Sequence, residues 1–175
     1  MNTKKILIWT NILLFLALLL IMFEMKPTRP DFYKDPVLKN LGLSKEKVIR
    51  KYGNPDKEGG MSESEYERDF FFYEKENVSF FFDKEAGVVS NIEVYPGTNI
   101  LGVVVGMTFN EIEKILGDPQ EKGYNFHDNN YTLSYFLGEK TEGMGEVEVW
   151  FSAEEEDGET EMAKVLWKKY WWEKN

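Results

Sequence analysis

The same pattern of apolar and polar positions occurs twice along the chain, once in residues 41–57 and again in residues 105–121. The second copy follows the first at a constant spacing of 64 residues, and no gap is needed to align them. The positions that keep their chemistry are Gly42 and Gly106, Leu43 and Met107, Ser44 and Thr108, Val48 and Ile112, Arg50 and Lys114, Gly53 and Gly117, Asn54 and Asp118, and Pro55 and Pro119. The pattern predicts two copies of one structural unit.

Each copy begins with a segment that is typical of a short amphipathic helix. Ser44 and Thr108 are the predicted N-caps, because a hydroxyl oxygen can accept a hydrogen bond from a free backbone N–H group of the first turn. Glu111 follows Thr108 by three residues and completes a capping box, whereas Lys47 occupies that position in the first copy. We therefore expect the second helix to be capped more completely than the first.

Each predicted helix ends at a glycine, Gly53 or Gly117, and a proline follows two residues later. Glycine tolerates the positive φ of a helix C-terminus, and proline prevents the helix from continuing. The pattern then changes to short apolar runs separated by Gly, Asp, Asn and Lys, which is typical of strands. Three strands are predicted in each copy: residues 66–73, 78–83 and 88–95 in the first, and residues 131–137, 146–151 and 163–172 in the second.

This order of elements predicts an α+β fold. Two tandem helix-plus-three-strand repeats share one antiparallel sheet, with the helices on one face, because one short helix cannot cover a sheet alone. Repeat 1 is assigned to residues 37–100 and repeat 2 to residues 101–175. One transmembrane helix is expected to precede them.

Alternation along the strands sorts the side chains onto two faces of the predicted sheet. The face toward the helices is predicted to hold Phe70, Phe72, Phe80, Phe82, Ile92, Val94, Leu133, Leu137, Val147, Val149 and Phe151. On the other face aromatic rings lie among acids and hydroxyls, a composition typical of interface cores. The candidate partner-binding residues on that face are Phe71, Tyr73, Phe81, Tyr95, Phe136 and Trp150. The alternative is that these rings only form cross-strand pairs that stabilise the sheet.

Residues 1–25 are predicted to form an uncleaved membrane anchor. Residues 6–23 carry no charged side chain, and a helix of that length reaches about 27 Å, close to the ~30 Å hydrocarbon core of a bilayer. A cleaved signal peptide is the alternative, but no small-residue cleavage site follows the run. Residues 26–36 contain three prolines and are expected to form an extended stalk. Basic residues flank the anchor equally, and the long C-terminal region favours an extracytoplasmic domain in a single-pass protein of the cell membrane.

Charge narrows the set of partners. Of 21 basic and 31 acidic residues, 17 and 30 remain beyond residue 30, which gives that part a net charge near −13. Such a field repels nucleic acids and anionic lipid headgroups, so we expect a protein or cell-envelope component with a basic surface and no nucleic acid. The chain has no cysteine, which excludes disulfides, zinc–thiolate sites and a thiol nucleophile.

The repeated signature Gly-[Leu/Met]-[Ser/Thr]-x3-[Val/Ile]-x4-Gly-x-Pro, followed by three strands, resembles the beta-lactamase-inhibitory-protein-like fold and the related SmpA/OmlA-like envelope lipoproteins. The resemblance covers residues 38–172. It implies one curved sheet with helices on its convex side, and a concave face or neighbouring loops that grip another protein. The inhibitor proteins carry disulfides and the envelope members a lipidated cysteine, and this chain has neither. The resemblance therefore implies the fold rather than beta-lactamase inhibition.

No residue is predicted to be catalytic, to bind a cofactor or to hold a metal. Residues 154–159 are rich in Glu and Asp but lack the spacing of an EF-hand loop, so a solvated hairpin tip is preferred to a calcium site. His127, the only histidine, lies among Asn and Asp and is interpreted as a surface residue. The sequence therefore predicts a membrane-anchored binding module, with a carboxylate-dependent cell-envelope hydrolase as the alternative.

Overall fold

The computed structural model describes residues 34–61, 68–139, 145–156 and 158–167, all of which belong to one compact unit, Asp31–Asn175. Within these ranges no helix has the length and apolar character needed to cross a bilayer. The predicted anchor and residues 26–33 of the predicted stalk lie outside the described residues. Membrane attachment therefore stays a prediction.

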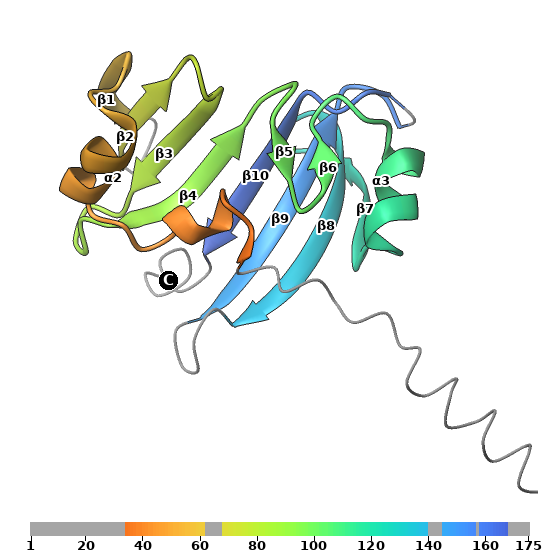
Figure 1. Ribbon diagram of the computed structural model, residues 1–175. Coiled ribbons are helices and arrows are strands. Elements are labelled where there is room, and N and C mark those ends of the chain that lie inside the picture. Colours follow the sequence, from red (N-terminus) through yellow and green to blue (C-terminus); the bar gives the residue numbers. More distant parts are fainter. Residues whose placement is uncertain (1–33, 62–67, 140–144, 157, 168–175) are drawn as a thin grey trace, which may run out of the picture. The chain divides into compact units, whose positions relative to one another are not determined.

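Repeat 1 opens with two helices and continues with four strands (Figure 1). Its elements are η2 (Leu38–Asn40), α2 (Lys45–Tyr52), β1 (Lys57–Met61), β2 (Arg68–Tyr73), β3 (Val78–Phe82) and β4 (Val89–Val94). A small hairpin of β5 (Asn99–Ile100) and β6 (Val103–Val104) spans the boundary between the repeats. Repeat 2 continues with one helix and four strands, which are α3 (Phe109–Leu116), β7 (Glu121–Asn125), β8 (Asn130–Glu139), β9 (Glu146–Ala153) and β10 (Met162–Trp167).

The main sheet contains eight strands in the order β1-β2-β3-β4-β10-β9-β8-β7, and all neighbouring strands are antiparallel. The two repeats meet through their last strands, β4 and β10, so β1 and β7 form the outer edges. An α+β fold with one antiparallel sheet is confirmed. The prediction of three strands per repeat is wrong, because each repeat has a fourth strand directly after its Gly-x-Pro segment.

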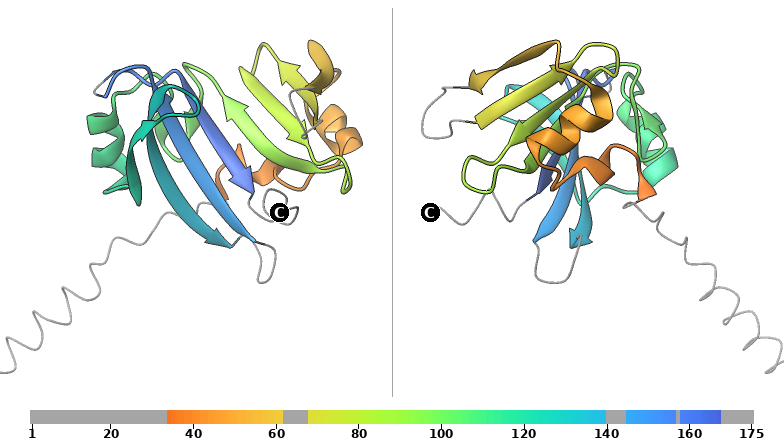
Figure 2. Two further views of the ribbon diagram at one scale, coloured as in Figure 1. Left: turned by 180° about the vertical axis from the view of Figure 1, so that it is seen from behind. Right: turned by 60° about the vertical axis from the view of Figure 1, so that its left-hand side comes forward.

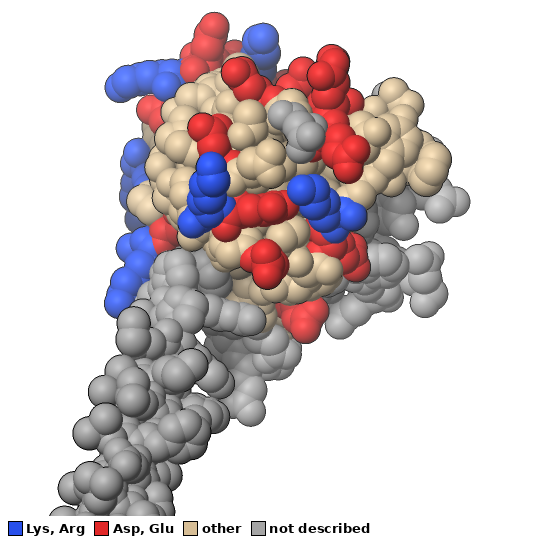
Figure 3. Space-filling model, turned by 90° about the vertical axis from the view of Figure 1, so that its right-hand side faces the viewer, with Lys and Arg blue, Asp and Glu red and all other residues tan. Residues whose placement is uncertain are grey.

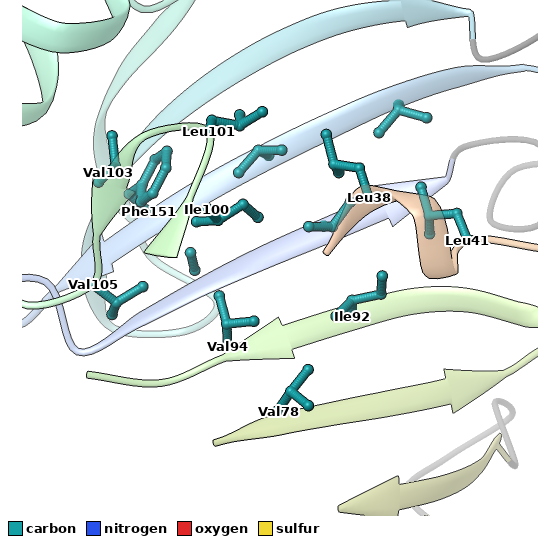
Figure 4. Close-up of a cluster of buried hydrophobic side chains, with 14 of the residues drawn as sticks. Leu38, Leu41, Val78, Ile92, Val94, Ile100, Leu101, Val103, Val105 and Phe151 are labelled. Atoms are coloured by element: carbon teal, nitrogen blue, oxygen red, sulfur yellow. The ribbon is translucent and has the colours of Figure 1, made fainter. Parts of the chain in front are cut away.

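One hydrophobic core lies between the sheet and the helices. Val48 of α2 and Ile112 of α3 are fully buried in it. Leu38, Leu41, Ile100 and Val105 extend the same cluster in the region of η2 and the β5–β6 hairpin (Figure 4). Figures 1 and 2 show that α2 lies near β1–β3 and α3 near β7–β8, with η2 and the hairpin between them. Helices α2 and α3 therefore cover the same face of the sheet.

The predicted capping difference between the two helices is confirmed. In α3 the Thr108 side chain accepts from the Glu111 N–H, and the Glu111 carboxylate accepts from the Thr108 N–H at 2.9 Å, which completes a capping box. The Thr108 hydroxyl also donates to Glu111 Oε2 at 3.0 Å, and the two bonds from Thr108 lower the pKa of Glu111. In α2 the hydroxyl of the N-cap Ser44 makes no hydrogen bond to the backbone, contrary to the prediction. The Ser44 side chain lowers the pKa of the Glu46 carboxyl group.

Both helices end as predicted, at a glycine with positive φ. Gly53 has φ 88° and ψ −167°, and Gly117 has φ 81° and ψ −167°. Their carbonyls each accept a hydrogen bond from a buried tyrosine of the sheet, Tyr73 or Tyr135, at 3.0 Å in both repeats. The same contact thus ties each helix end to the strand beneath it.

The turn that follows each helix is also built identically. Asp56 N donates to Phe72 O at 2.9 Å, and its counterpart Gln120 N donates to Ser134 O at 3.0 Å. The side chains of Asp56 and Gln120 then accept from the next strand, from Glu74 N and from Phe136 N, both at 2.8 Å. These bonds fix the register between helix, turn and sheet in both repeats.

Candidate binding surface

The face of the sheet opposite α2 and α3, named here the far face, carries a row of one side chain from each strand. Strand pairing places them opposite one another in the order Lys57, Phe72, Ser79, Glu93, Lys164, Trp150, Ser134 and Glu121. The first four belong to repeat 1, and the last four are their counterparts in reverse order. The two ends of the row therefore occupy equivalent places in the two repeats but carry different side chains.

The first hollow on the far face lies in repeat 1 and has a volume of about 520 Å³. Its aromatic lining consists of Phe70, Phe72 and Tyr95, with the ring centroids of Phe72 and Tyr95 6.0 Å apart. Lys57 also lines it and places its ammonium 5.6 Å from the Phe72 ring centroid. This hollow combines an apolar surface with one positive charge.

A chain of polar contacts leads from the first hollow to the centre of the far face. Ser79 Oγ and the Tyr95 hydroxyl lie 3.1 Å apart, and that hydroxyl donates to Glu93 Oε2 at 3.2 Å. Glu93 Oε1 pairs with Lys164 Nζ at 3.4 Å. Burial raises the pKa of Tyr95, the hydrogen bond with Ser79 opposes that rise, and the Glu93 carboxylate adds to it. Tyr95 therefore stays a neutral hydrogen-bond donor at neutral pH.

The second hollow lies in repeat 2 and has a volume of about 340 Å³. Gly123, Thr132 and Ser134 form its base, while Glu121 and Trp150 stand beside them on the same face. Thr132 and Ser134 thus stand in this hollow where the first hollow has the aromatic rings of Phe70 and Phe72. The volume is at the lower end of the range of about 300–1,000 Å³ that is usual for small-ligand sites.

Trp150 has an unusual feature. Its Nε1 atom is buried and has no hydrogen-bond partner among the described residues. Leaving a buried donor unpaired costs about 1–3 kcal/mol, so most proteins avoid it and exceptions call for an explanation. Trp150 is therefore a poor choice for stability alone.

The structure places the six predicted partner-binding residues in two groups. Tyr95 and Trp150 line hollows, Phe81 lies on the far face with only 8% of its surface exposed, and Phe136 lies on that face outside both hollows. Phe71 and Tyr73 belong instead to the core beneath the helices, 6% and 2% exposed. The face assignment of β2 is therefore wrong.

The residues that take their place are Phe70 and Phe72, which were predicted to face the helices but line the first hollow. The run from Phe70 to Tyr73 is aromatic at every position, so alternation does not show which side chains point toward the helices. The pairing of Phe71 with Phe80, a core residue of β3, places Phe71 on the helix side. The pairing of Phe72 with the exposed Lys57 likewise places Phe72 on the far face.

The remaining candidate chemistry lies away from the hollows. Glu154, Glu155 and Glu156 are exposed after β9, and His127 is exposed in the turn between β7 and β8. Among the residues that the structure describes, no three His, Asp or Glu side chains are grouped to hold a metal ion. Figure 3 shows the end of the domain that carries α3, where acidic side chains are spread widely with basic ones among them. Charge is thus distributed rather than gathered into a metal site.

Similar folds occur in solved structures. An extracellular protein with an SCP domain from Bacillus anthracis has 15% identity and a TM-score of 0.51 over 83% of this chain and 49% of that chain. A DUF4309 family protein of Bacillus subtilis has 18% identity and a TM-score of 0.47 over 70% and 77%. This chain thus spans about half the length of the first protein, and at 15% identity that likeness concerns the fold alone.

A candidate beta-lactamase inhibitor protein from Streptococcus mutans is also among the structural neighbours, with 12% identity and a TM-score of 0.29 over 71% of this chain and 82% of that chain. The resemblance to beta-lactamase-inhibitory-protein-like folds and to SmpA/OmlA-like proteins stays a prediction. No protein of curated function matches the sequence.

Fold and surface together define a duplicated α+β domain whose antiparallel sheet has one face covered by helices and the other lined with hollows. The chain belongs to the family described as "Domain of unknown function (DUF4309)", whose model matches residues 39–162.

Proposed function

We propose that this protein is a membrane-anchored, extracytoplasmic binding module that recognises a protein or another cell-envelope component through the far face. The observation that carries the proposal is that both repeats present a hollow on that face, at equivalent ends of one row of side chains. Sites that bind ligands combine concave apolar surface with a few convergent polar groups, and both hollows have that composition.

The chemistry of the first hollow suits an anchoring contact with a partner protein. Aromatic side chains contribute most to the binding free energy of interfaces, especially in partly enclosed positions. Phe70, Phe72 and Tyr95 offer such positions. The net charge near −13 beyond residue 30 favours a partner whose surface is basic around the contact. The resemblance to beta-lactamase-inhibitory-protein-like folds, in which a sheet face grips another protein, supports the same assignment.

A hydrolase would need a different site. Hydrolysis by carboxylates requires an acid and a base in one site. The linings of the two hollows include one carboxylate, that of Glu121. The described hollows therefore favour binding over catalysis.

The proposal is tested by photo-crosslinking of the full-length chain in intact cells. A photoreactive phenylalanine at position 72 should give an adduct with an envelope component, whereas the same group at position 115 should not. Ile115 is a suitable control because it is 46% exposed on α3, on the other side of the sheet. Equal adducts at both positions would overturn the assignment to the far face.

A second variant gives the energetic test. With the photoreactive group kept at position 72, replacing Phe70 and Tyr95 together by Ala should lower recovery of the crosslinked partner by about tenfold or more, the effect of losing interface anchors. Ile115→Ala should leave recovery unchanged. The position of the domain is tested in the same cells, since external protease should degrade it without lysis.

A further inference from the structure

The hollow in repeat 2 exists because of one missing side chain. In repeat 1 an added Cβ at Gly59 would lie 3.1 Å from the ring of Phe70, which fills the space above that glycine. The counterpart Gly123 is paired with Thr132 instead of a phenylalanine, and an added Cβ there would meet no atom within 4 Å. The space above Gly123 is therefore open to a ligand.

The groups around this space are mostly neutral and can both donate and accept hydrogen bonds. Thr132 lines the hollow and donates its hydroxyl to Asn130 Oδ1 at 3.2 Å, so its own oxygen can still accept a hydrogen bond. Ser134 contributes a second hydroxyl, and Glu121 an exposed carboxylate that only accepts. A ligand that fits must present several donors and acceptors in a small volume.

One aromatic side chain of the lining, that of Trp150, supplies a flat apolar surface. Trp150 lines the hollow with its indole while its Nε1 donor is buried without a partner. A phenylalanine at position 150 would have no unpaired donor but a smaller ring. What tryptophan adds to the hollow is therefore a larger flat surface. A ligand ring with C–H groups on its face and hydroxyl groups at its edge fits such a site. Its face can pack on the indole, and its hydroxyl groups can bond to the hydroxyl and carboxylate groups beside it.

We propose that this hollow binds one ring of a neutral oligosaccharide, with the sugar face on Trp150 and the sugar hydroxyls on Glu121, Thr132 and Ser134. The inference rests on the proposed function and names a ligand class for one part of the far face. An anionic ligand would meet the Glu121 carboxylate and the negative charge of the domain, and Lys122, which also lines the hollow, is paired with Glu113 at 2.8 Å. A cationic group would use that carboxylate but leave the hydroxyl-rich base without a matching set of donors and acceptors.

The test is titration calorimetry on the full-length chain in a detergent without sugar headgroups. The probes are β-1,4-linked tetramers of glucose and of N-acetylglucosamine, with hexalysine as the cationic comparison. Gly123→Val fills the hollow without straining the backbone, and Trp150→Ala removes the flat surface. Gly60→Val is the matched control, because it also lies in an edge strand and its added Cβ would meet only Asp69 Oδ1 at 3.8 Å.

We expect at least one tetramer to bind the parent chain. Gly123→Val and Trp150→Ala should each weaken its affinity by about tenfold or more, and Gly60→Val should leave the affinity unchanged. All three variants should be folded by circular dichroism. The proposal fails if neither tetramer binds at its highest soluble concentration, if both hollow variants bind as well as the parent chain, or if hexalysine alone binds in a Gly123-dependent way. Crosslinking at position 72 does not depend on this hollow, so its persistence in that case leaves the proposed function standing.

Discussion

Repeat 1 and repeat 2 use the same contacts on the helix side of the sheet and different side chains on the far face. The bonds Tyr73 to Gly53 and Tyr135 to Gly117 have the same atoms and the same length, 3.0 Å. On the far face, in contrast, Thr132 and Ser134 stand where repeat 1 has Phe70 and Phe72. The helix side thus repeats the contacts that stabilise the domain, and the far face has diverged, as expected if its two ends contact different chemical groups.

The strongest way to break this comparison is to remove equivalent core rings. Phe80 and Phe151 are both fully buried at corresponding positions of β3 and β9. Each change to Ala should destabilise the domain by about 3–5 kcal/mol. Phe80→Ala should lie at the upper end, because its ring also packs against Tyr52 and Tyr73 at 5.2 and 5.9 Å.

Urea unfolding followed by circular dichroism measures both effects. Because both rings belong to one core cluster, each variant should still unfold in a single transition. Two separate transitions in either variant would show that the repeats unfold independently, contrary to a shared core. The far-face change Phe72→Ala is the matched control and should cost less than either.

Equivalent glycines give the next largest effect. Gly53 and Gly117 have φ 88° and 81° with ψ near −167°, a region that is essentially restricted to glycine. Neither position would bring an added Cβ within 4 Å of another atom, so strain alone should make each change to Ala cost about 1–3 kcal/mol. Thermal unfolding should show similar losses at both sites. A difference larger than that range would mean that the two helix ends are not equivalent.

The hydroxyl groups of the equivalent residues Tyr73 and Tyr135 allow a finer comparison of the two repeats. Tyr73→Phe and Tyr135→Phe each remove one hydrogen bond to a helix-end carbonyl and should cost about 0.5–1.5 kcal/mol. Burial, with nearby carboxylates adding to it, raises the pKa of both tyrosines. The neutral phenol therefore stabilises the fold fully below the pKa of an unfolded tyrosine, about 10.

Above that pH the unfolded chain loses tyrosine protons first, so stability should fall as pH rises. The measurement is urea unfolding at neutral pH and at successive values above pH 10, in the parent chain and in Tyr135→Phe. The variant should lose less stability over the alkaline steps. Parallel decline in both chains would exclude Tyr135 as the source.

The smallest effect concerns the two helix starts. Lys47→Glu places a carboxylate where α3 has Glu111 and should create a capping box in α2, which raises the melting temperature by about 2 °C or less. A carboxylate in such a box has a lowered pKa, as Glu111 does. The gain should therefore disappear as pH falls and the carboxyl group becomes protonated. Lys47→Gln, which lacks the charge, is the control.

Local signals in the sequence were enough to predict the helices. Ser44, Thr108, Gly53 and Gly117 mark starts and ends because caps depend on residues within one turn of each other. The edge strands β1 and β7 were missed, because KEGGM and EKGYN have no apolar run and become strands only through pairing with β2 and β8. Edge strands of this kind carry charge and glycine rather than a hydrophobic pattern.

The candidate site was predictable where side chains alternate clearly. Trp150 lies between Val149 and Phe151, both core residues, so its place on the far face follows from period two. Phe71 and Tyr73 were misplaced because their neighbours are equally apolar. The hollow above Gly123 had no local signal, since it depends on which side chain faces that glycine from the next strand.

The pairing of β4 with β10 has a further consequence. Glu93 and Lys164 are counterparts in the two repeats, and they also lie opposite each other at the junction between them. Two identical subunits related by a two-fold axis would have to place like charges at this point, which is destabilising. Joining both copies in one chain lets the two positions carry opposite charges, so a clash at the symmetry axis becomes an ion pair of 3.4 Å.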